Sequence, residues 1–509
     1  MNRKAVTFFA FALMLSLGAA PLCAQTYEQK IDAAIQKVKT TDAKGRFSPD
    51  WPSLENYQIP QWYKDAKFGI FIHWGVYSVP AFNNEWYSRN MYQVDSPEFK
   101  HHIATYGPQS KFGYKDFIPL FKAEKFDPNH WAEVFRRAGA KYVVPVAEHH
   151  DGFAMYDNSY GKWNAATMGP KRDVIGLLEK AVRKRGLYFG VSSHRAEHYW
   201  FFNGGRQFPS DVQDPQYAGL YGDAAPQESA PSQEFLRDWL ARSTELVDKY
   251  NPDLVYFDWF IGEKPEYVPY IQQFAAYYYD RAAERNKHVV LNYKNKAFPE
   301  KAAVLDVERG HFADIRPLHW QTDTAISWKS WCYVENDELK PPESLVQLLV
   351  DVVSKNGNLL LDIGPKADGT IPAEQEERLL AIGKWLDTNA EAIYATHPWK
   401  KFGEGPVQPT AGAFKEKDEK PYTPADIRFT MKDGILYAIA LQSPADHKLL
   451  IRSLSSDSPL FSGKLDAVHL LGSKSQLKWA RTPEGLAVDL PADFQSSYPA
   501  VIKLTGTGF

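Results

Sequence analysis

Short apolar runs alternate with amphipathic segments from about residue 50 to residue 398. The apolar runs predict eight β-strands, at residues 68–74, 142–150, 188–194, 254–260, 289–295, 302–308, 326–334 and 357–363. The clearest amphipathic helix is "ESLVQLLVDVVSK" at 343–355, and further helices are expected at 171–186, 231–250 and 374–389. Buried strands that alternate with helices are typical of a parallel sheet, so eight such units predict an α/β fold with a (β/α)8-type, TIM-like barrel.

Two local features modify this barrel. Pro145 falls inside the second predicted strand, and because a proline cannot donate to a central ladder, we expect a bulge there. The stretch 195–230 is expected to be an insertion. It helps to explain why the barrel region, at roughly 350 residues, exceeds the ~250 residues typical of the fold.

The pattern changes after residue 398 to short alternating strands and turns. "IRFTMKDGILYAIALQ" places Asp433-Gly434 between two alternating runs, which predicts a hairpin, and "LKWARTPEGLAVDLP" repeats the pattern. We therefore expect an N-terminal lead-in at 25–49, the catalytic barrel at 50–398 and a C-terminal antiparallel β-sandwich at 399–509.

The first 24 residues have the pattern of a secretory signal peptide. Arg3 and Lys4 precede an apolar run from Ala5 to about Ala20, which is too short to span a bilayer, and small residues follow. Cleavage near Ala24 would remove Cys23 and leave Cys332 as the sole cysteine, so we expect a periplasmic protein without a disulfide. A lipoprotein anchor on Cys23 is the alternative, although Pro21-Leu22 is a poor context for it. No later segment reaches transmembrane length.

Composition narrows the class of partner. The formal net charge of −3 argues against a nucleic-acid partner or an acidic membrane. Aromatic residues make up 14% of the chain, with 15 Trp, 28 Tyr and 30 Phe. Aromatic rings fill cores and also stack on sugar rings, so this content favours a carbohydrate site slightly.

Polar side chains gather at the ends of the predicted strands. They are His73, Glu148-His149-His150-Asp151, His194, Asp258, Asn292-Tyr293-Lys294 and Glu308-Arg309. In a barrel these ends converge on one mouth, where active sites are built from several strands. Two carboxylates on different strands, Asp258 and Glu308, together with aromatic rings, suit the hydrolysis of a glycoside.

Each of these residues also has an ordinary structural interpretation. His73 could be a hydrogen-bonded structural residue, and Glu308-Arg309 could be a local ion pair. Asp258 could cap the following segment or pair with Arg309. The "HHD" cluster at 149–151 could bind zinc. Neighbouring side chains on a strand point to opposite faces, however, so His149 and His150 should not both bind one ion.

Six motifs together resemble the α-L-fucosidases of glycoside hydrolase family 29. They are "KFGIFIHWGVYSVP", "NEWYSRNMY", "EHHDGFAMYDN", "FGVSSHRAEHYW", "PDLVYFDWF" and "NGNLLLDIGPKADGTI". The resemblance runs from about residue 50 to Trp399, and the C-terminal sandwich also fits the family. It implies a retaining double displacement on terminal α-L-fucose, with no metal or organic cofactor.

The resemblance also implies roles for individual residues. Asp258 matches the family nucleophile, and Glu308 in "DVERG" aligns best with the acid/base. Gln321 in "HWQTD" stands where relatives often have a glutamate, and since an amide cannot donate a catalytic proton, Glu308 is favoured and Glu85 is the reserve candidate. The expected sugar-binding residues are His73, Glu85, Trp86, His149, His150, His194, Lys294 and Trp331.

Two details of that set stay open. Lys294 stands where many relatives have an arginine, which puts a bidentate contact in doubt. The 6-methyl group of fucose needs an apolar wall, and Trp259, Trp328 or Trp331 could provide it.

The implied substrate is a fucosylated oligosaccharide or glycoconjugate. Linkage preference is open, and a homo-oligomer is possible. Two alternatives are a metal-dependent barrel hydrolase that uses His149, His150 and Asp258, and a protein that binds fucosylated glycans without cleaving them.

Overall fold

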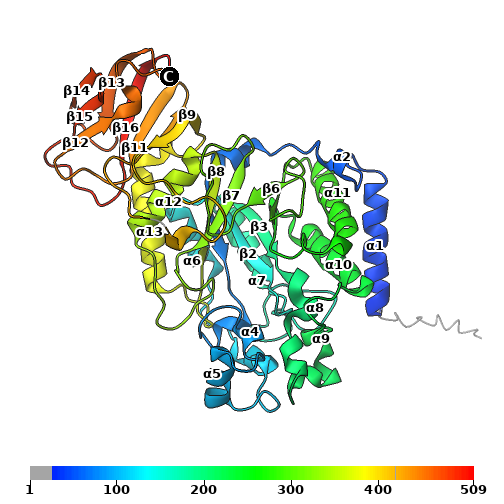
Figure 1. The fold of residues 1–509 in the computed structure, drawn as a ribbon. Coiled ribbons are helices and arrows are strands. Elements are labelled where there is room, and N and C mark those ends of the chain that lie inside the picture. The colour runs from blue at the N-terminus through cyan, green and yellow to red at the C-terminus, as the bar shows by residue number, and fades with distance from the viewer. Residues whose placement is uncertain (1–25, 419) are drawn as a thin grey trace, which may run out of the picture.

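The computed structural model describes residues 26–418 and 420–509, so the predicted signal segment, with Cys23, lies outside the described residues. Eight parallel strands close into a barrel in chain order (Figure 1). They are β1 (Phe68–Ile72), β2 (Tyr142–Glu148), β3 (Tyr188–Ser193), β4 (Leu254–Phe257), β5 (Val290–Lys294), β6 (Val304–Asp306), β7 (Trp320–Ala325) and β8 (Gly357–Ile363). The predicted barrel is confirmed.

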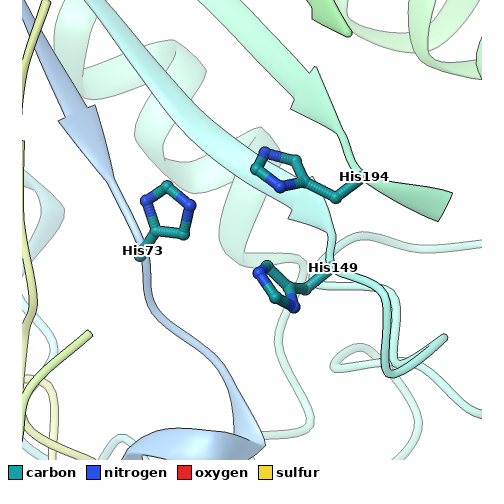
Figure 2. A group of neighbouring side chains, drawn as sticks. All are labelled: His73, His149 and His194. Carbon is teal, nitrogen blue, oxygen red and sulfur yellow. The ribbon is translucent and has the colours of Figure 1, made fainter. Parts of the chain in front are cut away.

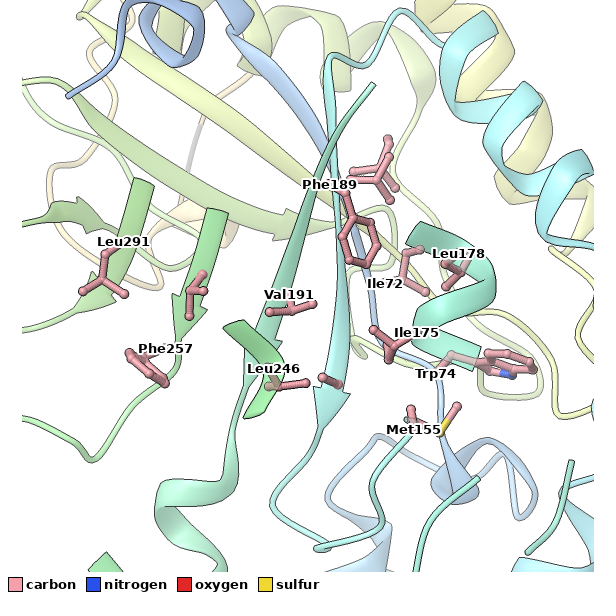
Figure 3. Packing of buried hydrophobic residues seen from close by; sticks show 14 of the residues in the cluster. Ile72, Trp74, Met155, Ile175, Leu178, Phe189, Val191, Leu246, Phe257 and Leu291 are labelled. Atoms are coloured by element: carbon pink, nitrogen blue, oxygen red, sulfur yellow. The ribbon is translucent and has the colours of Figure 1, made fainter. Parts of the chain in front are cut away.

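The barrel strands are buried on both faces, which is why they read as continuous apolar runs. Alternate side chains fill the barrel interior, among them Phe71, Val144 and Tyr256. The others face the surrounding helices, and Figure 3 shows part of that layer, where Phe189 of β3 lies near Ile175 of α7 (Val174–Lys184). Each strand therefore contributes to two packed layers.

The surrounding helices follow most of the strands. The main ones are α6 (Pro128–Arg137), α7, α10 (Gln233–Tyr250), α11 (Val268–Glu284), α12 (Pro342–Ser354) and α13 (Ala373–Asn389). No α-helix lies between β5 and β7, a stretch that the structure describes throughout, so the ring of helices is open there. The helices predicted from the sequence at 171–186, 231–250, 343–355 and 374–389 are confirmed.

Shorter helices fill the remaining connections. Between β1 and β2 lie α4 (Tyr87–Asn90) and α5 (Pro97–Tyr106), and the expected insertion after β3 contains α8 (His198–Phe201) and α9 (Ala218–Tyr221). Ahead of the barrel, α1 (Tyr27–Asp42) packs against α10 and α11 and is followed by α2 (Trp51–Leu54) and α3 (Gln61–Ala66). Figure 1 shows α1 along the outer side of the barrel.

The seventh strand was predicted in the wrong place. The sequence favoured 326–334, whereas β7 is the preceding segment "WQTDTA", Trp320–Ala325. Its inward side chains Gln321 and Asp323 are polar because they hydrogen-bond inside the barrel, so the strand lacks the apolar run that identifies its neighbours. Trp331 consequently lies in a loop that follows the strand.

The expected irregularity in β2 is present. The register between β2 and β3 shifts between Val146 and Glu148, just after Pro145. The shift turns Glu148 outward, where its carboxylate meets Arg195 and Arg242 of α10. The residues that follow Glu148 are thereby directed to the barrel mouth.

The C-terminal region forms two antiparallel sheets. One has five strands in the order β13 (Lys464–Leu470), β16 (Ala500–Thr507), β11 (Ile435–Ala440), β10 (Ile427–Lys432) and β9 (His397–Glu404). The other has three, β12 (Lys448–Ile451), β15 (Gly485–Asp489) and β14 (Lys478–Thr482). Asp433 and Gly434 join β10 to β11 with positive φ at both positions, 50° and 77°, which confirms the predicted tight hairpin.

A buried ion pair joins these sheets to the barrel. Arg428 of β10 donates to Asp351 of α12 over 2.6 Å, and Lys355 contacts the same carboxylate over 2.7 Å. Across residues 26–418 and 420–509, no helix combines the length and apolarity needed to span a membrane.

Candidate active site

A cavity of about 270 Å³ lies at the mouth of the barrel, beyond the C-terminal ends of the strands. All ten residues predicted for the site line it: His73, Glu85, Trp86, His149, His150, His194, Asp258, Lys294, Glu308 and Trp331. Four more line it that were not among the ten: Glu197, Trp259, Asp323 and Phe414. At least one polar residue from each of the six predicted strand ends therefore reaches this mouth, as the barrel predicts. The other residues named at those ends, Glu148, Asp151, Asn292, Tyr293 and Arg309, do not line the cavity.

Asp258 reaches the cavity because it continues the alternation of β4. Leu254 and Tyr256 point into the barrel, while Val255 and Phe257 face the helices. Asp258 directly follows the strand at an inward-pointing position, so its carboxylate enters the mouth of the barrel.

Three side chains surround the Asp258 carboxylate. Oδ2 lies 3.1 Å from Nδ1 of His194 and 3.5 Å from Nε2 of His150, and Oδ1 lies 3.5 Å from Nζ of Lys294. Burial alone would raise the pKa of Asp258, but His194 and Lys294 hold it well below its usual range. Because burial lowers the pKa of His194, that imidazole is neutral and acts as a hydrogen-bond donor, while Lys294 supplies the positive charge.

Glu308 follows the short strand β6 and, like Asp258, contacts Lys294. Its Oε2 accepts hydrogen bonds from Lys294 Nζ and from the indole N–H of Trp259. Burial, with Asp323 and Asp258 nearby, raises the pKa of Glu308 to about 6, although Lys294 opposes the rise. The two carboxyl groups therefore differ in pKa, because that of Asp258 is lowered and that of Glu308 is raised.

Lys294 is held at the centre of a group of buried carboxylates. Besides Asp258 and Glu308, its Nζ contacts Asp323 Oδ2 over 3.1 Å, and the Tyr256 hydroxyl donates to that same oxygen over 2.9 Å. Although burial alone would lower the pKa of Lys294, these carboxylates hold it above its usual value. Sequence reasoning missed Asp323 because it lies on the misplaced seventh strand.

Histidines form one wall of the cavity, and Figure 2 shows three of them, His73, His149 and His194, facing one another. Burial lowers the pKa of His73 to about 4 and that of His150 to about 3, so both are neutral at pH 7. His150 Nδ1 lies 2.7 Å from the carbonyl oxygen of His194, so Nδ1 carries the proton and Nε2 is left as an acceptor.

His149 and His150 both line the cavity, which corrects the expectation that neighbouring side chains point to opposite faces. That rule applies within a strand, and β2 ends at Glu148. Two groups of residues could nevertheless hold a metal ion, each with ligand atoms within 4.8 Å of one another: His73, His149 and His194, or His150, His194 and Asp258. His149 and His150 do not fall in the same group.

Two loops beside the histidines form another part of the cavity wall. Glu85 Oε2 accepts a hydrogen bond of 3.1 Å from the backbone N–H of Trp331, which joins the "NEWY" segment to the loop after β7. The guanidinium of Arg309 lies 4.6 Å from the Trp331 ring centre and supports it from behind. Trp86 lies near His150, with ring centres 5.4 Å apart.

Phe414 comes from the segment that connects β9 to β10, far along the chain. The backbone N–H of Phe414 donates to the carbonyl of Glu308 over 2.8 Å, and Gly412 donates to His311 over 2.9 Å. The Phe414 ring lies roughly parallel to Trp259, with ring centres 6.1 Å apart. A segment of the C-terminal region therefore forms part of the cavity wall.

Gln321 lies away from the cavity. Its amide oxygen accepts hydrogen bonds from Tyr63 and Tyr142, and its nitrogen donates to Asp306 over 2.7 Å. These bonds occupy both ends of the amide inside the barrel, which gives Gln321 a structural role.

Comparisons with known proteins all point to one family. A family model for α-L-fucosidase matches residues 34–391, and a model for the α-L-fucosidase C-terminal domain matches residues 420–505. Tissue α-L-fucosidase of Homo sapiens is 33% identical over 487 residues, which cover 93% of this chain and 95% of that protein. The plasma α-L-fucosidase of Rattus norvegicus is 34% identical over 456 residues, 87% of this chain and 90% of that protein.

A solved structure of Thermotoga maritima α-fucosidase in complex with fucose is also similar. It has 32% sequence identity and a TM-score of 0.71, and the match covers 90% of this chain and 100% of that one.

Proposed function

Since this chain belongs to the α-L-fucosidase family, a family of glycoside hydrolases, we propose that it is an exo-acting, retaining α-L-fucosidase. It would release terminal α-L-fucose from oligosaccharides or glycoconjugates by double displacement, through a covalent fucosyl-enzyme. Asp258 would be the nucleophile and Glu308 the acid/base.

The observation that carries this proposal is the cation shared by the two carboxyl groups. Lys294 Nζ lies 3.5 Å from Asp258 and is hydrogen-bonded to Glu308, so the nearest oxygens of the two groups cannot be further apart than these two contacts combined. That limit lies below the ~6.5–9.5 Å typical of inverting enzymes, which must leave room for a water molecule. The spacing favours a retaining mechanism.

The pKa values support the division of labour. Asp258 has a pKa well below its usual range and is ionised at neutral pH, as an attacking carboxylate must be. Glu308, with a pKa of about 6, can hold a proton for the leaving oxygen and afterwards accept one from water. Its Oε2 is engaged by Lys294 and Trp259, so Oε1 is the atom that would transfer the proton.

Fucose recognition would fall to the remaining walls. The neutral histidines can donate to or accept from sugar hydroxyl groups, and His150 Nε2 is an acceptor by its tautomer. Trp259 and Trp331 line the cavity and are the candidates for the wall against the 6-methyl group. Trp328, the third candidate, does not line the cavity and packs against Lys340 instead.

The test is Asp258→Gly assayed with a reactive aryl α-L-fucoside. We expect the rate to fall by several orders of magnitude and to be restored by azide, which enters the space of the missing carboxylate and yields a fucosyl azide of inverted configuration. Asp314→Gly, at an exposed aspartate in a loop, is the matched control. Activity like that of the wild type in Asp258→Gly would contradict the assignment.

The two histidine groups with suitable spacing keep a metal-dependent hydrolase as a second candidate. Exhaustive chelation separates the two candidates, because double displacement by carboxylates needs no metal and should be unaffected. Release of free fucose by the wild-type protein would exclude a protein that only binds fucosylated glycans.

We also infer from the N-terminal pattern that the protein is exported to the periplasm. Cell fractionation followed by N-terminal sequencing should find a mature chain that begins near residue 25. A lipid-modified Cys23 in the membrane fraction would instead support the lipoprotein alternative.

A further inference from the structure

A groove of about 640 Å³ opens beside the cavity and shares three residues with it, Trp86, Glu197 and Trp259. Its outer part is lined by Trp200 and Phe260 and by polar side chains that include Glu263. The roles proposed for the active site leave this groove and Glu197 without a function.

Glu197 is a buried carboxyl group at the junction of the two spaces. It lies in the short 3-10 helix Arg195–Glu197 directly after β3, and its residue is 5% exposed. Its Oε2 is buried and has no hydrogen-bond partner among the described residues. A buried carboxyl oxygen without a partner is costly, so a polar group of a ligand is the expected partner.

The nearest cation does not satisfy Glu197. Arg89 donates to the carbonyl of Phe201 over 2.6 Å and to Asn203 over 3.1 Å, and it stacks on Trp200. Burial, with Asp258 and Arg89 acting in opposite directions, raises the pKa of Glu197 well above its usual range. Glu197 therefore holds a proton more tightly than an exposed carboxyl group does, and in its protonated form it can both donate and accept a hydrogen bond.

The contacts of Trp259 indicate where the leaving group of the substrate lies. Its indole N–H is hydrogen-bonded to Glu308, the proposed acid, and its ring lines both the cavity and the groove. The glycosidic oxygen must lie within reach of Glu308, so the sugar attached through that oxygen lies at Trp259, where the groove begins.

Phe260 has a strained backbone conformation, and its side chain lines the groove. Phe260 has a φ of +83°, a conformation that bulky residues rarely adopt, and its ring lies 5.5 Å from that of Trp200. Strain of this kind collects at binding sites, where it positions a side chain. Here the Phe260 ring joins those of Trp86, Trp200 and Trp259 along the groove.

We propose that Glu197 and this groove bind the sugar to which fucose is attached, so that the preferred substrates are fucosylated oligosaccharides with at least one further pyranose. This inference rests on the proposed fucosidase activity. Trp86, Trp259 and Phe260 offer apolar ring faces for the pyranose, and Glu197 hydrogen-bonds to one of its hydroxyl groups. Glu197 would determine specificity without taking part in bond cleavage.

The test compares substrates that all need a proton for the leaving oxygen but differ in whether a second sugar follows fucose. Methyl α-L-fucoside has no second sugar and leaves the groove empty, whereas fucosylated trisaccharides with α1,2, α1,3, α1,4 and α1,6 linkages can fill it. For the linkage that the wild type cleaves fastest, we expect Glu197→Leu to lower the ratio of the two kcat/KM values, trisaccharide over methyl fucoside, by about ten- to a hundredfold. Glu197→Gln, which can still form hydrogen bonds, should lose less.

Phe260→Gly provides a second, independent variant. Glycine adopts the observed φ without strain, so the chain should fold, and loss of the ring should again lower the ratio. Glu266→Gln, at an exposed residue that lines neither space, is the control and should leave the ratio unchanged. Equal loss on both substrates, or no loss on either, would overturn the inference. A wild type that cleaves neither substrate would instead overturn the proposed function.

Discussion

Replacing Lys294 with methionine is expected to move both limbs of the pH profile to higher pH. The ammonium group contacts Asp258, Glu308 and Asp323, and methionine keeps much of the side-chain length while removing the charge. A carboxylate that loses a neighbouring cation holds its proton more tightly. The pKa values of Asp258 and Glu308 should therefore both rise in the variant.

The contact distances set the size of this effect. Two unit charges 3.5 Å apart, the separation of Lys294 Nζ and Asp258 Oδ1, interact by about 5 kcal/mol at an effective dielectric constant of about 20. One pKa unit corresponds to about 1.4 kcal/mol, and water entering the vacated space screens part of the interaction. We therefore expect each limb to move by about one pH unit or more.

The assay is the pH dependence of kcat/KM with two substrates. With a fucosyl oligosaccharide, the alkaline limb reports Glu308, whose pKa of about 6 predicts that wild-type activity falls above that pH. With α-L-fucosyl fluoride, whose leaving group departs without a proton, the acidic limb reports Asp258. Lys294→Arg retains the positive charge and is the matched control.

An unchanged profile in Lys294→Met would refute this reasoning, as would limbs that move to lower pH. A shift of the acidic limb alone would leave Asp258 as the nucleophile but contradict Glu308 as the acid.

Further predictions concern the acid/base residue, the buried ion pair at Asp351 and the alternative of a metal-dependent enzyme. Glu308→Gln should lower kcat/KM for oligosaccharides by about 10²–10⁴-fold and affect α-L-fucosyl fluoride far less, and equal losses would contradict its role as acid. Asp351→Asn should lower the free energy of unfolding by about 3–5 kcal/mol in denaturant titrations, because it leaves Arg428 buried without its carboxylate. Burial alone would raise the pKa of Asp351, but Lys355 and Arg428 hold it well below its usual range. The stability that this ion pair gives the wild-type fold should therefore be present above about pH 4 and be lost as the pH falls further. A free energy of unfolding that does not change in acid would contradict this. Exhaustive chelation should leave kcat unchanged, and a loss that zinc restores would favour the metal-dependent alternative.

Much of the barrel and its mouth could be predicted because burial leaves a pattern in the sequence. In β4 the apolar run identifies the strand, and its alternation places Asp258 inside. The same reasoning fails for β7, where Gln321 and Asp323 are buried through hydrogen bonds that the composition of the segment does not reveal. Asp323 was missed for this reason.

Other parts of the site depend on contacts that no local pattern records. Phe414 meets Glu308 across more than a hundred residues of chain, and only the folded structure brings the two together. Glu197 had a weak signal, since it is a carboxylic residue three positions after His194, at the end of the third strand. It falls at the start of the expected insertion at 195–230, where nothing in the sequence indicates that the side chain is buried.

The contribution of Phe414 to the cavity wall limits how this enzyme can be shortened or recombined. A chain cut after residue 398 would retain every barrel strand and both proposed catalytic carboxyl groups. It would nevertheless lose the backbone hydrogen bonds that the 412–415 segment makes to Glu308, Arg309 and His311. The barrel and the C-terminal region are therefore best inherited, exchanged or engineered as a single unit.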